Sequence, residues 1–396
     1  MNKKKLLFGF SLISFLLLTG CKGNDISTSL SNKEVVVYAD GSQIPSNNPT
    51  IEGSLKNAQE ISILPEAWMN YYHDLDDYTN VSKYYQAGVE NTKPINNTLT
   101  WSITDDGDYY IVYLSTSINM TNPLTIFSLE ESVELKDLYA GTHYYYQIYA
   151  HYTDRTVISR RFDFKTVDFF RTLDIDGVQN TRDIGNKLTA DGKKRVKQGL
   201  VYRSANLDNV TEKGKIQAIE QYGIKTDLDL REKGATSSPI GESVNYINNG
   251  FGQYGSPYYT GPAGVQQADY QPTMLANLQV FEDLNNLPLV FHCAVGRDRT
   301  GTLAVTLYLL LGIDLEQIRQ DFIVYAFTSI CNDSSPSVFY TNLENLLDYY
   351  SSYIGNDSVD NGTIYDRAVE YCNDIGLTNS EINTIRANLL EDVIDE

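Results

Sequence analysis

Cysteine and basic residues are both scarce in this chain. Four cysteines occur in 396 residues, and 31 lysines and arginines stand against 51 acidic residues, which gives a formal net charge of −20. This acidic excess argues against general nucleic-acid binding, because that function needs a basic surface. The one dense basic cluster, Lys193 to Arg195 with Lys197, either steers anionic substrates or forms a solvated turn, and the second interpretation is the more common.

Two of the four cysteines, Cys331 and Cys372, lie outside any motif. They form a disulfide if the protein is outside the cell, or they remain as two buried thiols. The sequence leaves both possibilities open.

The apolar run Leu6–Leu18 follows three lysines and is too short to span a membrane comfortably. It ends in Leu18-Thr19-Gly20-Cys21, which resembles the lipobox of bacterial lipoproteins, whose cysteine is diacylated and becomes the first residue after cleavage. An ordinary signal peptide and an uncleaved anchor are the alternatives. The resemblance implies a signal peptide at 1–20, lipidation of Cys21, a polar tether at 21–34 and a lipid-anchored, extracytoplasmic protein.

The most informative segment is His292-Cys293-Ala294-Val295-Gly296-Arg297-Asp298-Arg299-Thr300-Gly301. An apolar strand-like stretch, residues 287–291, precedes it, and an apolar helical run, residues 302–311, follows it. Strand, short loop and helix form the geometry in which backbone N–H groups converge on an anion at a helix N-terminus. The segment therefore predicts a phosphate-binding loop with a nucleophile at its base.

Each residue type in this loop suits phosphoryl transfer. Cys293 faces a helix N-terminus and an arginine, so we expect its pKa to fall to roughly 3.5–7.5 and its thiolate to attack phosphorus. Arg299 offers a planar fork that matches two phosphate oxygens. The Thr300 hydroxyl eases the departure of the sulfur, Gly296 lets the backbone turn, and the amides of residues 294–297 bind the phosphate. This chemistry needs neither a metal nor a cofactor.

The loop resembles the signature loop of the cysteine-dependent phosphatases, the protein tyrosine and dual-specificity superfamily. Three upstream segments, in their order and spacing, resemble the bacterial tyrosine phosphatase family that also includes dual protein and phosphoinositide phosphatases. They are Asn180-Thr181-Arg182-Asp183-Ile184-Gly185, Tyr202-Arg203-Ser204 and Asp229-Leu230-Arg231. The resemblance covers about residues 168–396. Arg297 stands where the family usually has lysine, so substrate preference, particularly toward phosphoinositides, does not carry over.

Supporting roles around the loop follow from the resemblance. The residues concerned are Arg182, Asp183, Arg203, Asp229, Arg231 and His292, the last of which braces the loop by hydrogen bonds. An ordinary surface ion pair between Arg182 and Asp183 is the alternative for those two residues.

A carboxyl group is the expected general acid for the leaving oxygen. The tryptophan-proline-aspartate loop that other tyrosine phosphatases carry is absent, since both tryptophans lie in the first half of the chain. Asp298 is the first candidate, and its alternative role is to hold Arg297 or Arg299 in place. Asp229 is the second candidate, with an alternative role as an anchor at a strand end.

Residues 35–167 predict an all-β domain. Short runs rich in Tyr, Ile, Val and Thr, at 98–103, 109–115, 144–149 and 159–164, are separated by turn-forming residues. Leu138-x-x-Gly141-x-x-Tyr144 resembles the tyrosine corner of fibronectin type III domains, and residues 161–166 resemble their last strand. The resemblance implies a fibronectin type III-like β-sandwich.

Residues 168–396 predict a cysteine-phosphatase domain of the α/β class, with a sheet flanked by helices and the site at the C-terminal ends of the strands. Thr211, Asp314 and Thr378 are expected to cap helices. Residues 234–270 contain seven glycines and predict a long loop or lid over the site.

These features predict an exported, membrane-anchored phosphatase that hydrolyses phosphotyrosine or related phosphomonoesters through a phosphocysteine intermediate. Its expected partners are a phosphorylated protein or small phosphoester and, through the lipid anchor, the membrane. Two alternatives remain open. One is a phosphoinositide or inositol-phosphate phosphatase, and the other is a non-catalytic surface-binding lipoprotein.

Overall fold

The computed structural model describes residues 33–393 except 47–49, 57, 74–80, 82, 85, 252–261, 267, 269, 332–336 and 357–360. The predicted signal peptide, Cys21 and most of the predicted tether lie outside the described residues. The chain divides into two compact units. Unit 1 comprises the residues up to 52 with 101–131 and 146–161, and unit 2 comprises 53–100, 132–145 and 162–396. This division does not test the domain boundary expected at residue 167, which stays a prediction.

Unit 1 is built from antiparallel strand pairs. β1 pairs with β2 and β10, and β6 pairs with β7. These strands are β1 (Val35–Tyr38), β2 (Gln43–Pro45), β6 (Tyr109–Ser115), β7 (Leu124–Ser128) and β10 (Arg155–Ile158). In β6 the alternate residues Tyr110, Val112 and Leu114 are buried, as expected for a strand with one face on a core. Trp101 packs edge-on against Tyr110, with 5.2 Å between ring centroids.

Three strands contribute residues to both units: β3 (Ile51–Gly53), β5 (Asn97–Ile103) and β9 (His143–His151). Unit 2 also holds β4 (Gln59–Ile61), β8 (Ser132–Leu135) and β11 (Phe162–Thr166). The strands expected at 98–103 and 144–149 are confirmed as β5 and β9. The strand expected at 159–164 begins later, as β11, because the Ser159 hydroxyl accepts the Ile148 N–H and donates to the Arg160 carbonyl before the ladder starts.

Tyr144 makes a hydrogen bond to the backbone a few residues upstream. Its hydroxyl accepts the backbone N–H of Tyr139, with 2.7 Å between nitrogen and oxygen. Its ring stacks on Phe164, with centroids 5.3 Å apart. This local geometry is that of a tyrosine corner.

Helix α1 (Glu66–His73) buries a tryptophan among aromatic rings of unit 2. The Trp68 side chain is fully buried, and its ring lies 4.9 Å from Phe170 and 4.2 Å from Phe327 between centroids. Aromatic side chains of this size bury large apolar areas, so this contact is a substantial part of the local core.

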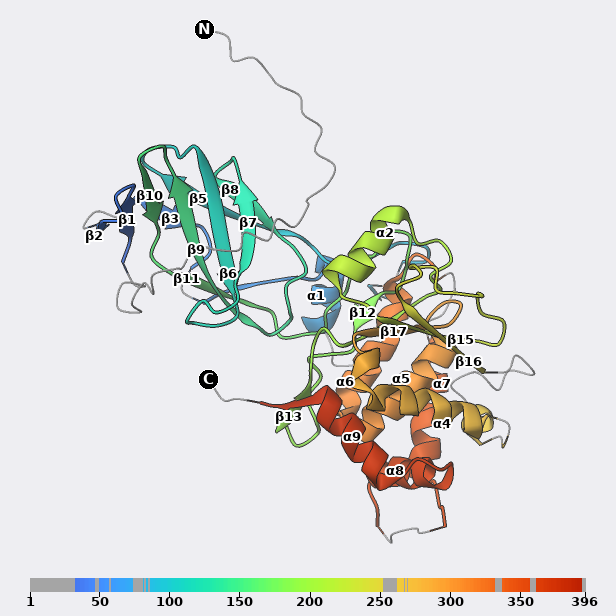
Figure 1. Ribbon diagram of the computed structural model, residues 1–396. Coiled ribbons are helices and arrows are strands. Elements are labelled where there is room, and N and C mark those ends of the chain that lie inside the picture. Colours follow the sequence, from blue (N-terminus) through green and yellow to red (C-terminus); the bar gives the residue numbers. More distant parts are fainter. Residues whose placement is uncertain are drawn as a thin grey trace. The chain divides into compact units, whose positions relative to one another are not determined.

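Unit 2 contains a five-stranded sheet in the order β12-β14-β17-β15-β16. Figure 1 labels four of its strands, β12, β15, β16 and β17. The strands are β12 (Arg182–Asp183), β14 (Val201–Ser204), β15 (Thr226–Arg231), β16 (Asn245–Phe251) and β17 (Leu289–His292). All neighbours are parallel except β12 and β14. Every residue of β14 and β17 is buried, as is usual for strands covered on both faces.

Helices cover both faces of this sheet. Val290 of β17 packs with Tyr222, just after η3 (Gln217–Gln221), on one face. Phe291 points to the other face and packs edge-on against Phe281, with 6.0 Å between ring centroids. The α/β class expected for this part of the chain is therefore the one observed.

The remaining elements of unit 2 are mostly helical. They are α2 (Glu212–Ile216), α3 (Pro262–Val265), α4 (Gln271–Gln279), η4 (Val280–Glu282), η5 (Leu284–Asn286), α5 (Asp298–Leu311), α6 (Leu315–Ile323), η6 (Val324–Phe327), α7 (Ser337–Ser351), α8 (Ile364–Asp374), α9 (Asn379–Leu389) and the pair β13 (Lys194–Val196) and β18 (Leu390–Asp392). The expected caps are confirmed, since the side chains of Thr211, Asp314 and Thr378 each accept a backbone N–H at a helix start. None of the helices in the described ranges has the length and hydropathy that a membrane span requires.

The expectation of a continuous loop at 234–270 is wrong for part of that segment. Residues 245–251 form β16, which lies parallel to β15 at the edge of the sheet, and 262–265 form α3. Gly250 sits beside a register shift, where a Cβ atom would lie 2.2 Å from the Arg231 carbonyl oxygen. Glycine in this strand therefore marks a close backbone approach and not a loop. Residues 252–261 lie outside the described residues.

Candidate active site

The predicted strand, loop and helix are present in the structure. β17 ends at His292, α5 begins at Asp298, and residues 293–297 form the connection, named here the signature loop. Gly296 has a φ of +70°, and a Cβ atom there would lie 2.3 Å from the Ser204 carbonyl oxygen. Only glycine meets both conditions, so the tight turn at this position is fixed by the sequence.

Each carbonyl oxygen from Cys293 to Gly296 accepts a hydrogen bond. Along the loop the donors are His292 Nδ1 at 3.2 Å, Asn206 Nδ2 at 2.7 Å, Asn180 Nδ2 at 2.9 Å and Arg203 Nη2 at 3.0 Å. In a trans peptide the N–H of the next residue points away from the carbonyl. The four carbonyls held outward therefore turn the amides of residues 294–297 to the inner side of the loop, at the N-terminus of α5. This arrangement suits an anion such as phosphate.

The thiol of Cys293 lies in this loop and is 1% exposed. Burial raises the pKa of Cys293, but the Arg299 charge and hydrogen bonding from the side chain and backbone of Thr300 outweigh burial and lower the pKa below its ordinary value. The Thr300 hydroxyl is fully buried and makes no hydrogen bond that meets the distance and angle limits among the described residues, but the Thr300 side chain contributes to the lowered pKa of Cys293. The role of this thiolate in catalysis, with Arg299 and Thr300 in support, stays a prediction.

His292 is braced from behind the loop by an aspartate that the sequence reading missed. Its Nε2 lies 2.9 Å from Asp227 Oδ1, and the other oxygen of Asp227 accepts the Ser238 hydroxyl at 2.8 Å. Burial lowers the pKa of His292, but the hydrogen bond and charge of Asp227 outweigh it and raise the pKa. Asp227 lies two residues before the predicted Asp229 in β15. Alternate side chains of a strand point to the same face, so this spacing was the signal from which Asp227 could have been predicted.

Asp229 holds neighbouring side chains in place at the end of β15. Its oxygens accept the Arg231 side chain at 2.7–3.1 Å and the Tyr246 hydroxyl at 3.0 Å, and Arg231 also holds Asp208 at 2.7 Å. Burial raises the pKa of Asp229, but the bonds from Arg231 and the charge of His292 lower it below its ordinary value. A carboxylate held ionised in this way is a poor general acid.

Asp298 is the first residue of α5 and is 8% exposed. Arg297 Nε donates to Asp298 Oδ1 at 2.9 Å, and the guanidinium of Arg297 lies 5.0 Å from the centre of the Tyr325 ring. The alternative in which Asp298 holds Arg297 is therefore realised. The Asp298 charge also reaches Cys293 and opposes the lowering of the thiol pKa.

Arg182 and Asp183 do not form the surface ion pair that was the alternative for them. Both side chains are fully buried. Asp183 pairs with Arg171 at 3.3 Å and accepts the backbone N–H groups of Gly185 and Gly199 at 2.8 and 2.6 Å. Arg182 turns instead toward Asp321, with 3.0 Å between Nε and Oδ1.

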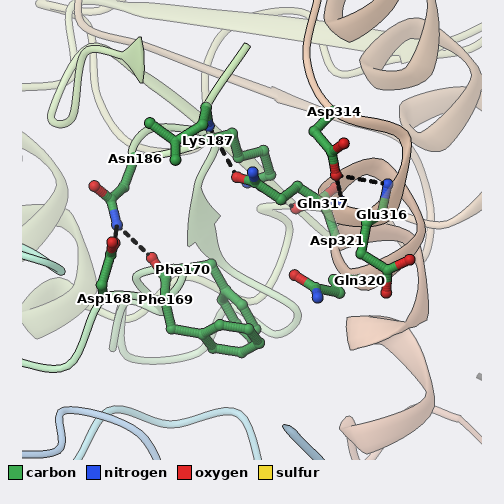
Figure 2. Close-up of a pocket in the computed structure, with 11 residues that line it drawn as sticks. Asp168, Phe169, Phe170, Asn186, Lys187, Asp314, Glu316, Gln317, Gln320 and Asp321 are labelled. Carbon is green, nitrogen blue, oxygen red and sulfur yellow. Dashed lines mark hydrogen bonds and ion pairs between the residues drawn. The ribbon is translucent and has the colours of Figure 1, made fainter. Parts of the chain in front are cut away.

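Asp321 of α6 is a second residue that sequence reasoning missed. It is 1% exposed, and its Oδ2 accepts Arg203 Nη1 at 2.6 Å while its Oδ1 accepts Arg182. It also lines a cavity of about 270 Å³ (Figure 2). The lining residues are Asp168, Phe169, Phe170, Asn186, Lys187, Leu188, Asp314, Glu316, Gln317, Gln320 and Asp321.

The dense basic cluster at residues 193–197 is engaged with the C-terminal end of the chain. Lys194 pairs with Asp392 at 2.6 Å, and Lys197 donates to the carbonyls of Ala387 and Asn388 at 3.1 and 2.9 Å. These contacts favour the structural interpretation over substrate steering. Cys331 and Cys372 are both buried and neither is in a disulfide, so the disulfide alternative is wrong.

Residues 173–391, more than half of the chain, match the sequence profile of the tyrosine phosphatase family. The chain belongs to this family. A curated relative named "Putative tyrosine-protein phosphatase", from Cupriavidus necator, is 24% identical over an alignment of 179 residues, and the match covers 38% of this chain and 62% of the relative.

Two solved structures resemble parts of the chain. The core catalytic domain of the PP-IP phosphatase SIW14 from S. cerevisiae is 16% identical with a TM-score of 0.26, and the match covers 36% of this chain and 78% of that one. TpbA of P. aeruginosa is 15% identical with a TM-score of 0.27, and the match covers 45% and 96% of the two chains. Likenesses this weak support no conclusion about substrate.

Proposed function

We propose that this protein is a phosphatase that hydrolyses phosphotyrosine or related phosphomonoesters through a phosphocysteine intermediate. The observation that carries the proposal is the Cys293 thiol, whose pKa is lowered inside a loop whose Val295 and Gly296 carbonyls are held by Asn180 and Arg203. Membership of the tyrosine phosphatase family supports the same conclusion. The whole reaction uses side chains and backbone groups of this chain.

In the first step, the Cys293 thiolate attacks phosphorus, a P–S bond forms and the P–O bond to the leaving group breaks. Arg299 and the amides of residues 294–297 hold the phosphoryl oxygens and stabilise the charge that spreads over them. Asp298 donates a proton to the leaving oxygen. In the second step, water gives a proton to Asp298 and attacks phosphorus, the P–S bond breaks, and inorganic phosphate leaves with the thiolate restored.

The test is hydrolysis of p-nitrophenyl phosphate and of a phosphotyrosine peptide in EDTA, with the Cys293→Ser variant beside the wild type. Metal-independent turnover that disappears in the variant is the expected result. Absence of turnover in freshly reduced wild-type protein would reject the proposal and favour a surface-binding lipoprotein with an inert phosphatase domain.

Substrate class is tested by adding phosphoinositides and inositol hexakisphosphate to the same assay. Phosphotyrosine is favoured here, because the basic cluster at 193–197 is tied to β18 and the end of α9. Faster turnover of the polyphosphates than of the phosphotyrosine peptide would select the inositol-phosphate alternative.

The proposal extends to the remainder of the chain. Residues 35–167 form a fibronectin type III-like β-sandwich, supported by the hydrogen bond between the Tyr144 hydroxyl and the Tyr139 N–H, and residues 168–396 form the catalytic domain. Residues 1–20 are a lipoprotein signal peptide, and acylation of Cys21 anchors the exported protein to the membrane through the tether at 21–34. A Cys21→Ala variant that still fractionates with membranes would reject the lipid anchor.

A further inference from the structure

The signature loop is held by a buried charge network whose centre is a single carboxylate. Asp321 accepts Arg182 through Oδ1 and Arg203 through Oδ2, and its backbone carbonyl accepts Arg182 Nη2 at 3.0 Å. Both arginines and the aspartate are at most 1% exposed. Long side chains lose considerable rotamer freedom when fixed, so a common partner that fixes two of them at once has a large effect on their order.

Each arginine is connected by hydrogen bonds to a different carbonyl of the loop. Arg203 contacts the loop directly, because its Nη2 donates to the Gly296 oxygen at 3.0 Å. Arg182 reaches it through Asn180, since Arg182 Nη1 donates to Asn180 Oδ1 at 2.6 Å and Asn180 Nδ2 donates to the Val295 oxygen at 2.9 Å. Two of the four outward contacts of the loop therefore depend on Asp321.

The charges around Asp321 add to the dependence of the loop on this residue. Lys187 Nζ lies 3.5 Å from Asp321 Oδ1, so three buried cations surround one carboxylate. Burial raises the pKa of Asp321, but Arg182, Lys187 and Arg203 outweigh it and hold the pKa far below its ordinary value. The carboxylate therefore stays ionised throughout the range in which Cys293 titrates.

Asp321 is also one of the residues that line a cavity, although it is itself only 1% exposed. Figure 2 shows Asp321 at the wall of the 270 Å³ cavity, with Gln317 and Gln320 of the same helix beside it. Asp314 lines the same cavity at the start of α6, where it caps the helix by accepting the Glu316 N–H at 2.9 Å.

We propose that Asp321 is a positioning residue for the phosphate-binding loop, which it holds in its productive shape through Arg182 and Arg203. This inference rests on the proposed function, because the loop shape matters only if the loop binds a phosphoryl group. Asp321 touches no reacting atom. It acts through the carbonyls of Val295 and Gly296 and thereby on the amides that follow them.

The test compares Asp321→Asn with Asp314→Asn in the full chain. Both variants remove one negative charge from the same helix and cavity, but only Asp321 contacts the arginines, and asparagine remains a good helix cap at 314. We expect kcat/KM for p-nitrophenyl phosphate to fall by roughly 10- to 100-fold in Asp321→Asn, as is typical when the partner that orients an active-site group is removed. Inhibition by inorganic phosphate should weaken in parallel, and Asp314→Asn should match the wild type.

A second readout separates positioning from charge and needs no substrate. The rate at which iodoacetamide alkylates Cys293 is followed against pH by mass spectrometry of the peptide that contains it. Loss of a negative charge near the loop would by itself lower the pKa of Cys293, whereas loss of ordered amides raises it. A positioning role therefore predicts a higher Cys293 pKa in Asp321→Asn.

The proposal is overturned if the Cys293 pKa falls, or if Asp321→Asn behaves as Asp314→Asn does. If Asp321→Asn fails to fold, Arg203→Lys takes its place, because an ammonium group cannot bond Asp321 and the Gly296 carbonyl with the geometry of the guanidinium fork. The same rise in the Cys293 pKa is then expected, and its absence counts against the proposal. Wild-type protein without phosphatase activity would reject the proposed function, while the alkylation profiles would still decide the role of Asp321.

Discussion

Replacing Gly296 with alanine should both destabilise the protein and inactivate it. The φ of +70° costs an alanine about 1–2 kcal/mol, because its Cβ approaches the following carbonyl oxygen. In addition, the new Cβ would lie 2.3 Å from the Ser204 carbonyl oxygen, and backbone has to move to relieve that contact. Overpacking of this kind costs about 1–3 kcal/mol. We therefore expect a total loss of about 2–5 kcal/mol in the free energy of unfolding.

Gly192 provides a matched control, because it has the same φ of +70° and no atom within 4 Å of the position that a Cβ would take. Gly192→Ala should lose only the backbone contribution of about 1–2 kcal/mol and keep full activity. Urea denaturation followed by circular dichroism gives the two free energies of unfolding, and p-nitrophenyl phosphate hydrolysis gives the activities. Equal destabilisation of the two variants, or an active Gly296→Ala, would refute the argument that Ser204 and the tight turn define the loop.

Three further predictions concern the charges around the thiol. Arg299→Met removes the leading cause of the lowered pKa of Cys293, so its alkylation by iodoacetamide at neutral pH should slow by about tenfold or more; an unchanged rate would show that Arg299 does not act on the thiol. Asp298→Asn should lose more activity on phosphoesters with poor leaving groups than on p-nitrophenyl phosphate, and equal losses would argue against an acid role. The raised pKa of His292 means that its pair with Asp227 stabilises the fold fully below about pH 6.5 and loses that effect as pH rises through the higher folded-state pKa. Asp227→Asn should accordingly cost about 3–5 kcal/mol at acidic pH and less at alkaline pH, as measured by urea unfolding across pH, and a cost that grows with pH would contradict this sign.

The centre of the site could be predicted from sequence because its parts are contiguous. Cys293, Gly296 and Arg299 lie in one strand-loop-helix segment, and the local hydrophobic pattern indicates both flanking elements. The residues that hold the segment were harder to find. Asp321 lies 118 residues from Arg203 in the chain, and an aspartate in an amphipathic helix usually faces solvent.

Other misses have similar physical reasons. β16 reads as a loop because asparagine and glycine disfavour strands, yet its ladder with β15 outweighs that preference. Arg182 and Asp183 are adjacent and oppositely charged, but they sit on a strand, where neighbouring side chains point to opposite sides. Their partners, Asp321 and Arg171, come from elements that local sequence does not bring together.

The distribution of tryptophan makes the two compact units optically distinguishable. Trp101 lies in the core of unit 1 beside Tyr110, and Trp68 lies in unit 2 against Phe170 and Phe327. The chain has no other tryptophan, so each unit carries one intrinsic fluorophore. Trp68→Phe and Trp101→Phe variants would thus report separately, by emission wavelength alone, whether the two units melt together or one after the other.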